Sequence, residues 1–179
     1  MDSYVQFTIT FLLFVSLILP LTTFVHELGH ALTALLLFKE PVGIRLGNSI
    51  KGSGFKVGKL TIKIQPLSGF VGFVDYPIPK DKNNSVLHAL ILIAGPVFSF
   101  TLCLFSYMLI TFLDFQFIIN YLLKSIMNAS LAQFIFTIIP IRYPSLFGSY
   151  RGMPSDGYRV MKLMMKWREI ANTNRGKPD

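Results

Sequence analysis

The feature that most constrains the fold is an apolar stretch at residues 4–38. Its only side chains that can carry a charge at or just below neutral pH are His26, Glu27 and His30. About 20 apolar residues cross the hydrocarbon core of a bilayer as a helix. The stretch is too short for two spans with a turn between them, so it predicts one long helix. We expect Pro20 to kink this helix or to divide a span from a shorter half-helix.

Composition also indicates a membrane protein. Only 15% of the 179 residues are charged and the mean hydropathy is +0.54, whereas a soluble domain carries about 25% charged residues. The net charge of +8 flanks apolar runs, which favours a lipid bilayer and not nucleic acid as the partner. No basic residue precedes the first apolar run, so we predict a retained span and not a cleaved signal peptide. The single cysteine, Cys103, is expected to be a small buried hydrophobe.

Two more spans are predicted, at residues 86–113 and 116–141. The intervening loop, 39–85, alternates apolar and polar residues, which predicts strands with a bulge at Gly58-Lys59 and an apolar segment dipping toward the membrane surface near 66–74. A basic amphipathic helix at about 156–171 suits the membrane interface.

The predicted fold class is therefore a polytopic α-helical membrane protein. It has about three core transmembrane helices, a small membrane-associated β-rich loop and a C-terminal amphipathic helix. We expect residues 1–179 to form a single membrane-embedded domain, because no linker separates two parts.

Charge predicts the orientation of the chain in a cell membrane. The 39–85 loop and the tail from Arg142 each carry eight Lys or Arg and three acidic residues. The residues before the first span and the loop at Asp114 contain no Lys or Arg. Basic segments stay in the cytoplasm. We therefore predict a multi-pass protein with its N-terminus outside and its C-terminus in the cytoplasm, and with the ionisable residues His26, Glu27 and His30 toward the cytoplasmic side.

The sequence His26-Glu27-Leu28-Gly29-His30 is an HExxH motif. On a helix both histidines lie on one face and can reach one Zn²⁺ at about 2.0–2.1 Å. Glu27 can then take a proton from a water that the metal acidifies. A charged group at mid-membrane costs roughly 2.5–3.5 kcal/mol on insertion scales, and a shared metal would explain three ionisable groups in one span. The alternative is two neutral histidines and a protonated glutamate, all satisfied by neighbouring helices.

A catalytic zinc usually has a third protein ligand. The acids on the same predicted side and beyond the third span are Asp156 and Glu169, and the residues alone leave both open. Ser155 or Asp156 would also make a good N-cap for the tail helix.

Four features together resemble the site-2 protease family of intramembrane metalloproteases, over roughly residues 20–160. They are the HExxH motif, the loop segment Pro66–Val71, Ala94-Gly95-Pro96 in the second span, and Ser155-Asp156-Gly157 after the third. The resemblance implies one Zn²⁺ per chain, with Asp156 as its third ligand beside His26 and His30. It also implies that Glu27 is the catalytic acid/base.

The chain departs from that family at two positions where asparagine is common, since Ser99 and Thr137 stand there, and in an insertion at about 142–153. Which groups position the substrate is therefore open. Gly95-Pro96 is expected to permit close helix packing or a kink, and Asn128 to form an interhelical hydrogen bond.

The resemblance implies proteolysis in or near the transmembrane segments of single-pass membrane proteins, with a regulatory membrane partner or a homo-oligomer left open. The alternative is an inactive pseudoprotease or metal-binding scaffold that binds transmembrane helices. A transporter is disfavoured because three spans show no inverted repeat. We further expect segment 39–75 to pair with the substrate as a strand, and proline substitutions along Leu60–Ile64 to reduce cleavage.

Overall fold

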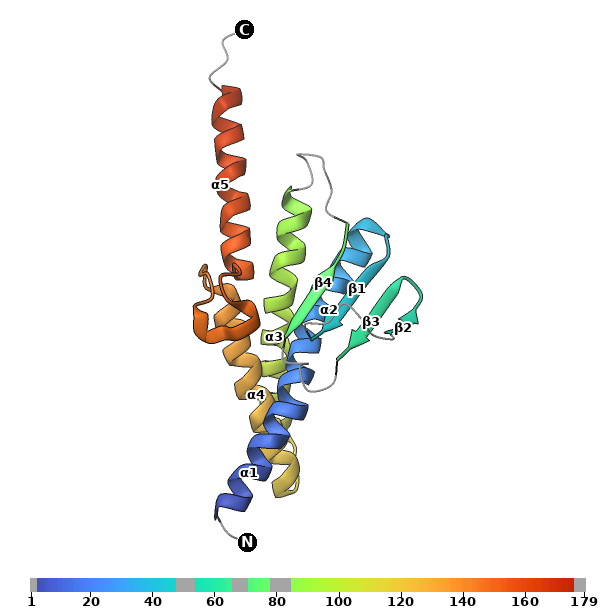
Figure 1. The fold of residues 1–179 in the computed structure, drawn as a ribbon, viewed down its shortest axis with the longest axis vertical. Coiled ribbons are helices and arrows are strands. Elements are labelled where there is room, and N and C mark those ends of the chain that lie inside the picture. The colour runs from blue at the N-terminus through green and yellow to red at the C-terminus, as the bar shows by residue number, and fades with distance from the viewer. Residues whose placement is uncertain (1–2, 48–53, 66–70, 78–84, 176–179) are drawn as a thin grey trace.

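The computed structural model describes residues 3–47, 54–65, 71–77 and 85–175. Long helices follow the longest axis of the molecule, and a small sheet lies beside them (Figure 1). The N-terminus and the C-terminus lie at opposite ends.

The first apolar stretch forms one continuous helical rod. It consists of α1 (Ser3–Leu13), a π-helical segment (Phe14–Ile18) and α2 (Leu19–Phe38). Pro20 lies two residues after the end of the π segment, whose wider turn leaves room for the proline ring and for the missing backbone hydrogen bond. The rod ends at Lys39, whose backbone is left-handed with φ 56°. The single long helix predicted from the sequence is confirmed.

Two more helices pack beside this rod. Helix α3 (Ser85–Phe112) contacts both α2 and α4 (Phe117–Ile138). Among the described residues, two helices are long and apolar enough to cross a membrane, Tyr4–Phe38 and Ser85–Phe112. Helix α4 is not one of them; Lys124 and other polar residues interrupt its 22 residues. Cys103 is buried in α3, as predicted.

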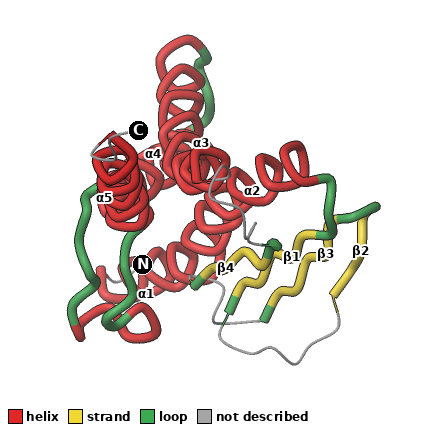
Figure 2. Tube along the Cα trace, turned by 90° about the horizontal axis from the view of Figure 1, so that it is seen from above, coloured by secondary structure: helices red, strands yellow, loops and turns green. Residues whose placement is uncertain are grey.

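The segment after α2 contains a four-stranded mixed sheet with strand order β2-β3-β1-β4. Strand β1 (Val42–Leu46) is parallel to β3 (Leu60–Ile64) and antiparallel to β4 (Gly72–Asp75). Strand β2 (Gly54–Val57) is antiparallel to β3. Figure 2 shows the sheet to one side of the helices.

Two details of the predicted loop were wrong. Gly58 and Lys59 form the turn of a β2–β3 hairpin and not a bulge, because the φ of Gly58 is +58° and the chain reverses there. Residues 72–74 were predicted to belong to an apolar loop, but Gly72–Asp75 forms β4. Residues 66–70 of that predicted loop lie outside the described part of the chain.

Alternation along β1 fixes the sheet to the helices. Its first, third and fifth residues are buried and the two between them are not. The buried face joins one hydrophobic core with α2 and α3, formed by Ala31, Ala34, Val42, Ile44, Leu46, Ile62 and Ile91. The sheet is thereby anchored beside the half of α2 that carries the HExxH motif.

After α4 the chain makes a closed loop, with a 3₁₀ helix at Ser145–Tyr150, and then enters α5 (Asp156–Arg175). Backbone bonds tie the two ends of this loop together, from Tyr143 N–H to Met153 C=O and from Ser155 N–H to Ile141 C=O. The tail helix begins where predicted and ends four residues later.

Candidate metal centre

The two histidines of the motif lie one turn apart on α2 and point the same way. Their Nε2 atoms are 3.2 Å apart, and both side chains are buried. The helical spacing alone produces this pair, because residues four apart share a helix face.

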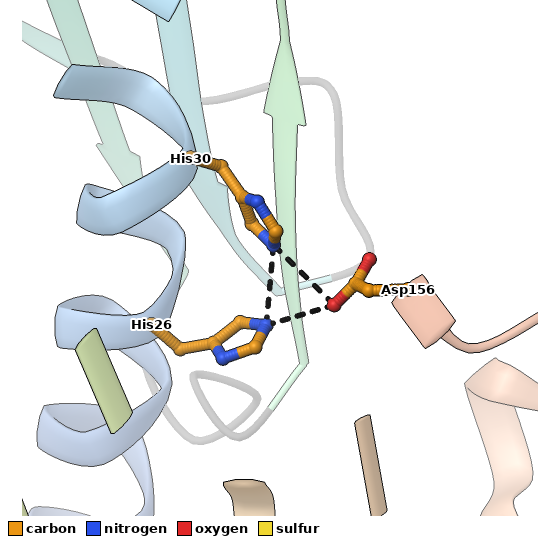
Figure 3. Close-up of side chains that lie close together, drawn as sticks. All are labelled: His26, His30 and Asp156. Atoms are coloured by element: carbon orange, nitrogen blue, oxygen red, sulfur yellow. Dashed lines mark hydrogen bonds and ion pairs between the residues drawn. The ribbon is translucent and has the colours of Figure 1, made fainter. Parts of the chain in front are cut away.

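Asp156 completes the group from 130 positions away. Its Oδ2 lies 3.2 Å from Nε2 of His26 and 3.4 Å from Nε2 of His30 (Figure 3). Asp156 is the first residue of α5. Burial alone would raise the pKa of its carboxyl group, but the nearby histidines lower this pKa, so the carboxylate is ionised at neutral pH. The structure thus brings together the three residues that the sequence indicated.

The geometry of this group fits a zinc ion. Ligands at about 2.0–2.1 Å in a tetrahedron lie about 3.3–3.4 Å from one another. The three observed separations are 3.2, 3.2 and 3.4 Å.

The outer nitrogens of both rings support the same conclusion. Nδ1 of His30 lies 2.7 Å from the carbonyl oxygen of Ile91, which only accepts, so this nitrogen carries the proton. Nδ1 of His26 lies 2.9 Å from the buried hydroxyl of Ser99. To bind a metal, each ring would offer the lone pair of its Nε2 beside the Asp156 carboxylate, which requires the ring proton to be on the outer nitrogen. Such outer partners fix the ring orientation of metal-binding histidines.

Two glycines allow α2 and α3 to approach closely while leaving room for the His30 ring. A Cβ on Gly95 would collide with Nε2 of His30, and a Cβ on Gly29 would lie 2.6 Å from the carbonyl oxygen of Ala94. Glycine at both positions allows the two helices to pack closely at the level of the motif. The close packing predicted for Gly95 is therefore observed, with the added role of leaving space for His30.

Ser155 determines how Asp156 is presented. The Ser155 hydroxyl accepts a bond from Tyr158 N–H at 3.1 Å and donates to the carbonyl of Ile139 at 2.6 Å. Ser155 therefore makes the capping bond to the start of α5. The carboxylate of Asp156 does not make this capping bond and faces the histidines.

Glu27 lies between the metal group and the sheet. Its side chain is buried, and a Cβ on Gly72 of β4 would come within 2.6 Å of its Oε1. The first residue of β4 therefore packs directly on the carboxyl group of Glu27.

Other residues considered from the sequence lie apart from the group. Glu169 is exposed on α5, about 20 Å along the helix from Asp156, so it does not share the site. The hydroxyl of Thr137 bonds to carbonyls of its own helix, and Asn128 is exposed. The contact of Ser99 with His26 could not be predicted from the sequence, because nothing in an apolar span indicates which residue a serine contacts.

The donor set is that of metalloproteases that combine HExxH with a distant aspartate, here presented by a mostly helical chain with two long apolar helices and a small mixed sheet. A sequence model of peptidase family M50, which is of the site-2 protease type, matches residues 13–170, and the chain belongs to this family. This family uses zinc. A search of curated proteins finds no match.

Proposed function

We propose that this protein is a membrane-embedded zinc endopeptidase that hydrolyses peptide bonds in or near the transmembrane segments of single-pass membrane proteins. The observation that carries the proposal is the convergence of His26, His30 and Asp156 with Glu27 beside them. Membership of peptidase family M50 supports it.

The residues divide the chemistry between them. His26, His30 and Asp156 would hold one zinc ion, which when bound polarises a carbonyl and acidifies water. Glu27 would take a proton from the attacking water and return it to the leaving amine. Ser99 and the carbonyl of Ile91 hold the two imidazole rings in orientation.

A position in the membrane is supported by the exposed apolar surface. In the apolar segment of Tyr4–Phe38 only 17% of the residues are buried, and in that of Ser85–Phe112 only 39% are buried. A core helix of a soluble protein is mostly buried. Large exposed apolar side chains occur on every helix of the bundle, including Phe7, Leu36, Phe112, Phe117 and Ile118. We propose that α4 is the third span, and that the N-terminus lies outside and α5 in the cytoplasm.

Within segment 39–75, which we expect to pair with a substrate strand, β4 is an edge strand of the sheet and Leu60–Ile64 is not. Strand β3 already pairs with β2 and β1, so a substrate strand has no access to Leu60–Ile64. The hydrogen bond from Gly47 N–H to Val71 C=O shows that Gly47 and Val71 form a hydrogen-bonded pair. Because such pairs alternate along an antiparallel ladder, the next pair, Leu46 and Gly72, is not hydrogen-bonded. The N–H and C=O of Gly72 therefore point away from β1. We propose that an extended substrate adds to this open edge of β4, next to Glu27.

A proline at Val74 tests this edge. By the same alternation the N–H of Val74 points outward, so Val74→Pro removes a bond to the substrate and spares the β1–β4 bonds. We expect cleavage to fall several-fold while zinc content stays unchanged. Lys56→Pro, on the opposite edge strand β2, is the matched control and should leave cleavage unaltered. Equal cleavage by both variants would contradict binding at β4.

The proposed activity is tested with purified protein in lipid vesicles containing a panel of single-pass membrane proteins. We expect zinc-dependent cleavage that Glu27→Gln lowers by about 10²- to 10⁴-fold at unchanged zinc content. Glu40→Gln, just beyond α2, is the control. Zinc binding and substrate binding without cleavage by the wild type would instead identify a metal-binding scaffold.

A further inference from the structure

Tyr150, the last residue of the 3₁₀ helix in the α4–α5 loop, has no part in the chemistry proposed so far. Its hydroxyl accepts a hydrogen bond from Gly72 N–H at 2.7 Å and donates to Gly72 C=O at 3.4 Å. Burial raises the pKa of Tyr150. The hydroxyl therefore stays protonated at neutral pH and can donate as well as accept.

These two bonds fall on the open edge of the sheet. The N–H and C=O of Gly72 both point away from β1, and β4 is the terminal strand on that side. In an antiparallel pair, a residue of the neighbouring strand would exchange N–H···O bonds with both groups. The phenol oxygen of Tyr150 therefore occupies both backbone groups of Gly72 that an incoming strand would use.

Gly72 of β4 also lies against the proposed catalytic carboxyl group. A Cβ at this position would lie 2.6 Å from Oε1 of Glu27 and 2.7 Å from Cγ2 of Thr23. A peptide backbone paired with Gly72 would thus lie at the level of Glu27. The hydroxyl of Tyr150 covers the edge where that pairing would occur.

The surrounding loop holds Tyr150 in this position. Its ring centroid lies 6.0 Å from that of Phe73 on β4 and 5.6 Å from that of Tyr143 in the same loop. The loop is closed by backbone bonds between its two arms and leads directly into Asp156. The contact with β4 therefore comes from the same segment that supplies the third metal-binding candidate.

We infer that Tyr150 is a latch that occupies the hydrogen-bonding position of the substrate on β4, so that an extended peptide must displace its hydroxyl to pair beside Glu27. The inference rests on the proposed function. The latch favours ligands whose extended backbone forms enough strand bonds to replace it. A short or helical segment cannot make this replacement.

The test is the binding of a fluorescein-labelled peptide hydroxamate with leucine, valine and threonine side chains, whose hydroxamate binds zinc and whose backbone extends from the metal. It is measured on the zinc-loaded full chain as wild type, Tyr150→Phe and Tyr143→Phe. Tyr150→Phe keeps the ring contacts but removes the hydroxyl that competes for Gly72. The hydroxyl of Tyr143 bonds to the carbonyl of Phe136 and makes a matched control.

We expect Tyr150→Phe to lower Kd by about 2- to 10-fold, the effect of removing one competing neutral hydroxyl group, and Tyr143→Phe to match the wild type. An unchanged or higher Kd for Tyr150→Phe overturns the latch. Failure of the peptide hydroxamate to bind the wild type and both variants also overturns it. Tighter binding together with no cleavage by the wild type contradicts the peptidase and leaves the latch standing. Cleavage with equal Kd values contradicts the latch alone.

Discussion

The two halves of the metal centre are built differently. His26 and His30 lie within one helix, and each ring has a second partner on α3, the Ser99 hydroxyl or the Ile91 carbonyl. Asp156 lies at the start of α5 and reaches the histidines through a loop that Ser155 fastens to the end of α4. Helix packing thus holds one half, whereas loop hydrogen bonds hold the other. The histidine half should tolerate substitution less well than the loop.

Gly95→Ala gives the largest expected effect on the histidine half short of removing a ligand. The new methyl group would occupy the position of the His30 ring, so the ring must turn away from the other donors. We expect zinc affinity to fall by 100-fold or more, beyond the roughly 10- to 100-fold effect of losing an outer-shell partner. Isothermal titration with zinc measures this.

Gly29→Ala is the informative companion variant. Its methyl group would meet the backbone carbonyl of Ala94 and the side chain of Phe98, so it pushes the helices apart. We expect it to lower the melting temperature more than Gly95→Ala does. If Gly95→Ala lowered the melting temperature and left zinc affinity unchanged, the role of Gly95 would be packing alone.

Ser99→Ala should have a smaller effect. It removes the oxygen that faces Nδ1 of His26 and leaves the ring free to change tautomer. We expect about a 10-fold loss of zinc affinity with little change in stability. Ser106→Ala, at another buried serine of α3, is the control and should bind zinc like the wild type. Equal affinities for the two variants would show that the contact with Ser99 does not orient His26.

The same division explains what could be predicted from the sequence. The histidine pair follows from helical spacing, and the long first helix from the length of its apolar stretch, so both were predicted correctly. The position of Asp156 depends on a loop fold that no local pattern encodes, and only family resemblance indicated it. The strand order of the sheet was also out of reach, because alternation identifies strands but does not say which of them lies at an edge. The proline substitutions predicted from the sequence, along Leu60–Ile64, therefore fall on the inner strand β3.

The contact between Ser99 and His26 shows the same limit. A serine within an apolar helix can bond to its own helix or to a neighbour, and the sequence does not distinguish these cases. Thr101 and Thr111 in the same helix bond back to carbonyls four residues earlier, whereas Ser99 faces His26. Only the packing of α3 against α2 decides between these outcomes.

The central claim is that His26 and His30 of α2 and Asp156 of α5, which are far apart in the sequence, hold one zinc ion. The most direct measurement is zinc content and affinity for the purified wild type, Asp156→Ala and the control Asp114→Ala, with folding checked by circular dichroism. We predict about one zinc per chain in the wild type and the control, and loss or strong weakening in Asp156→Ala. A well-folded wild type without zinc, or an Asp156→Ala variant that binds zinc as the wild type does, would contradict the account.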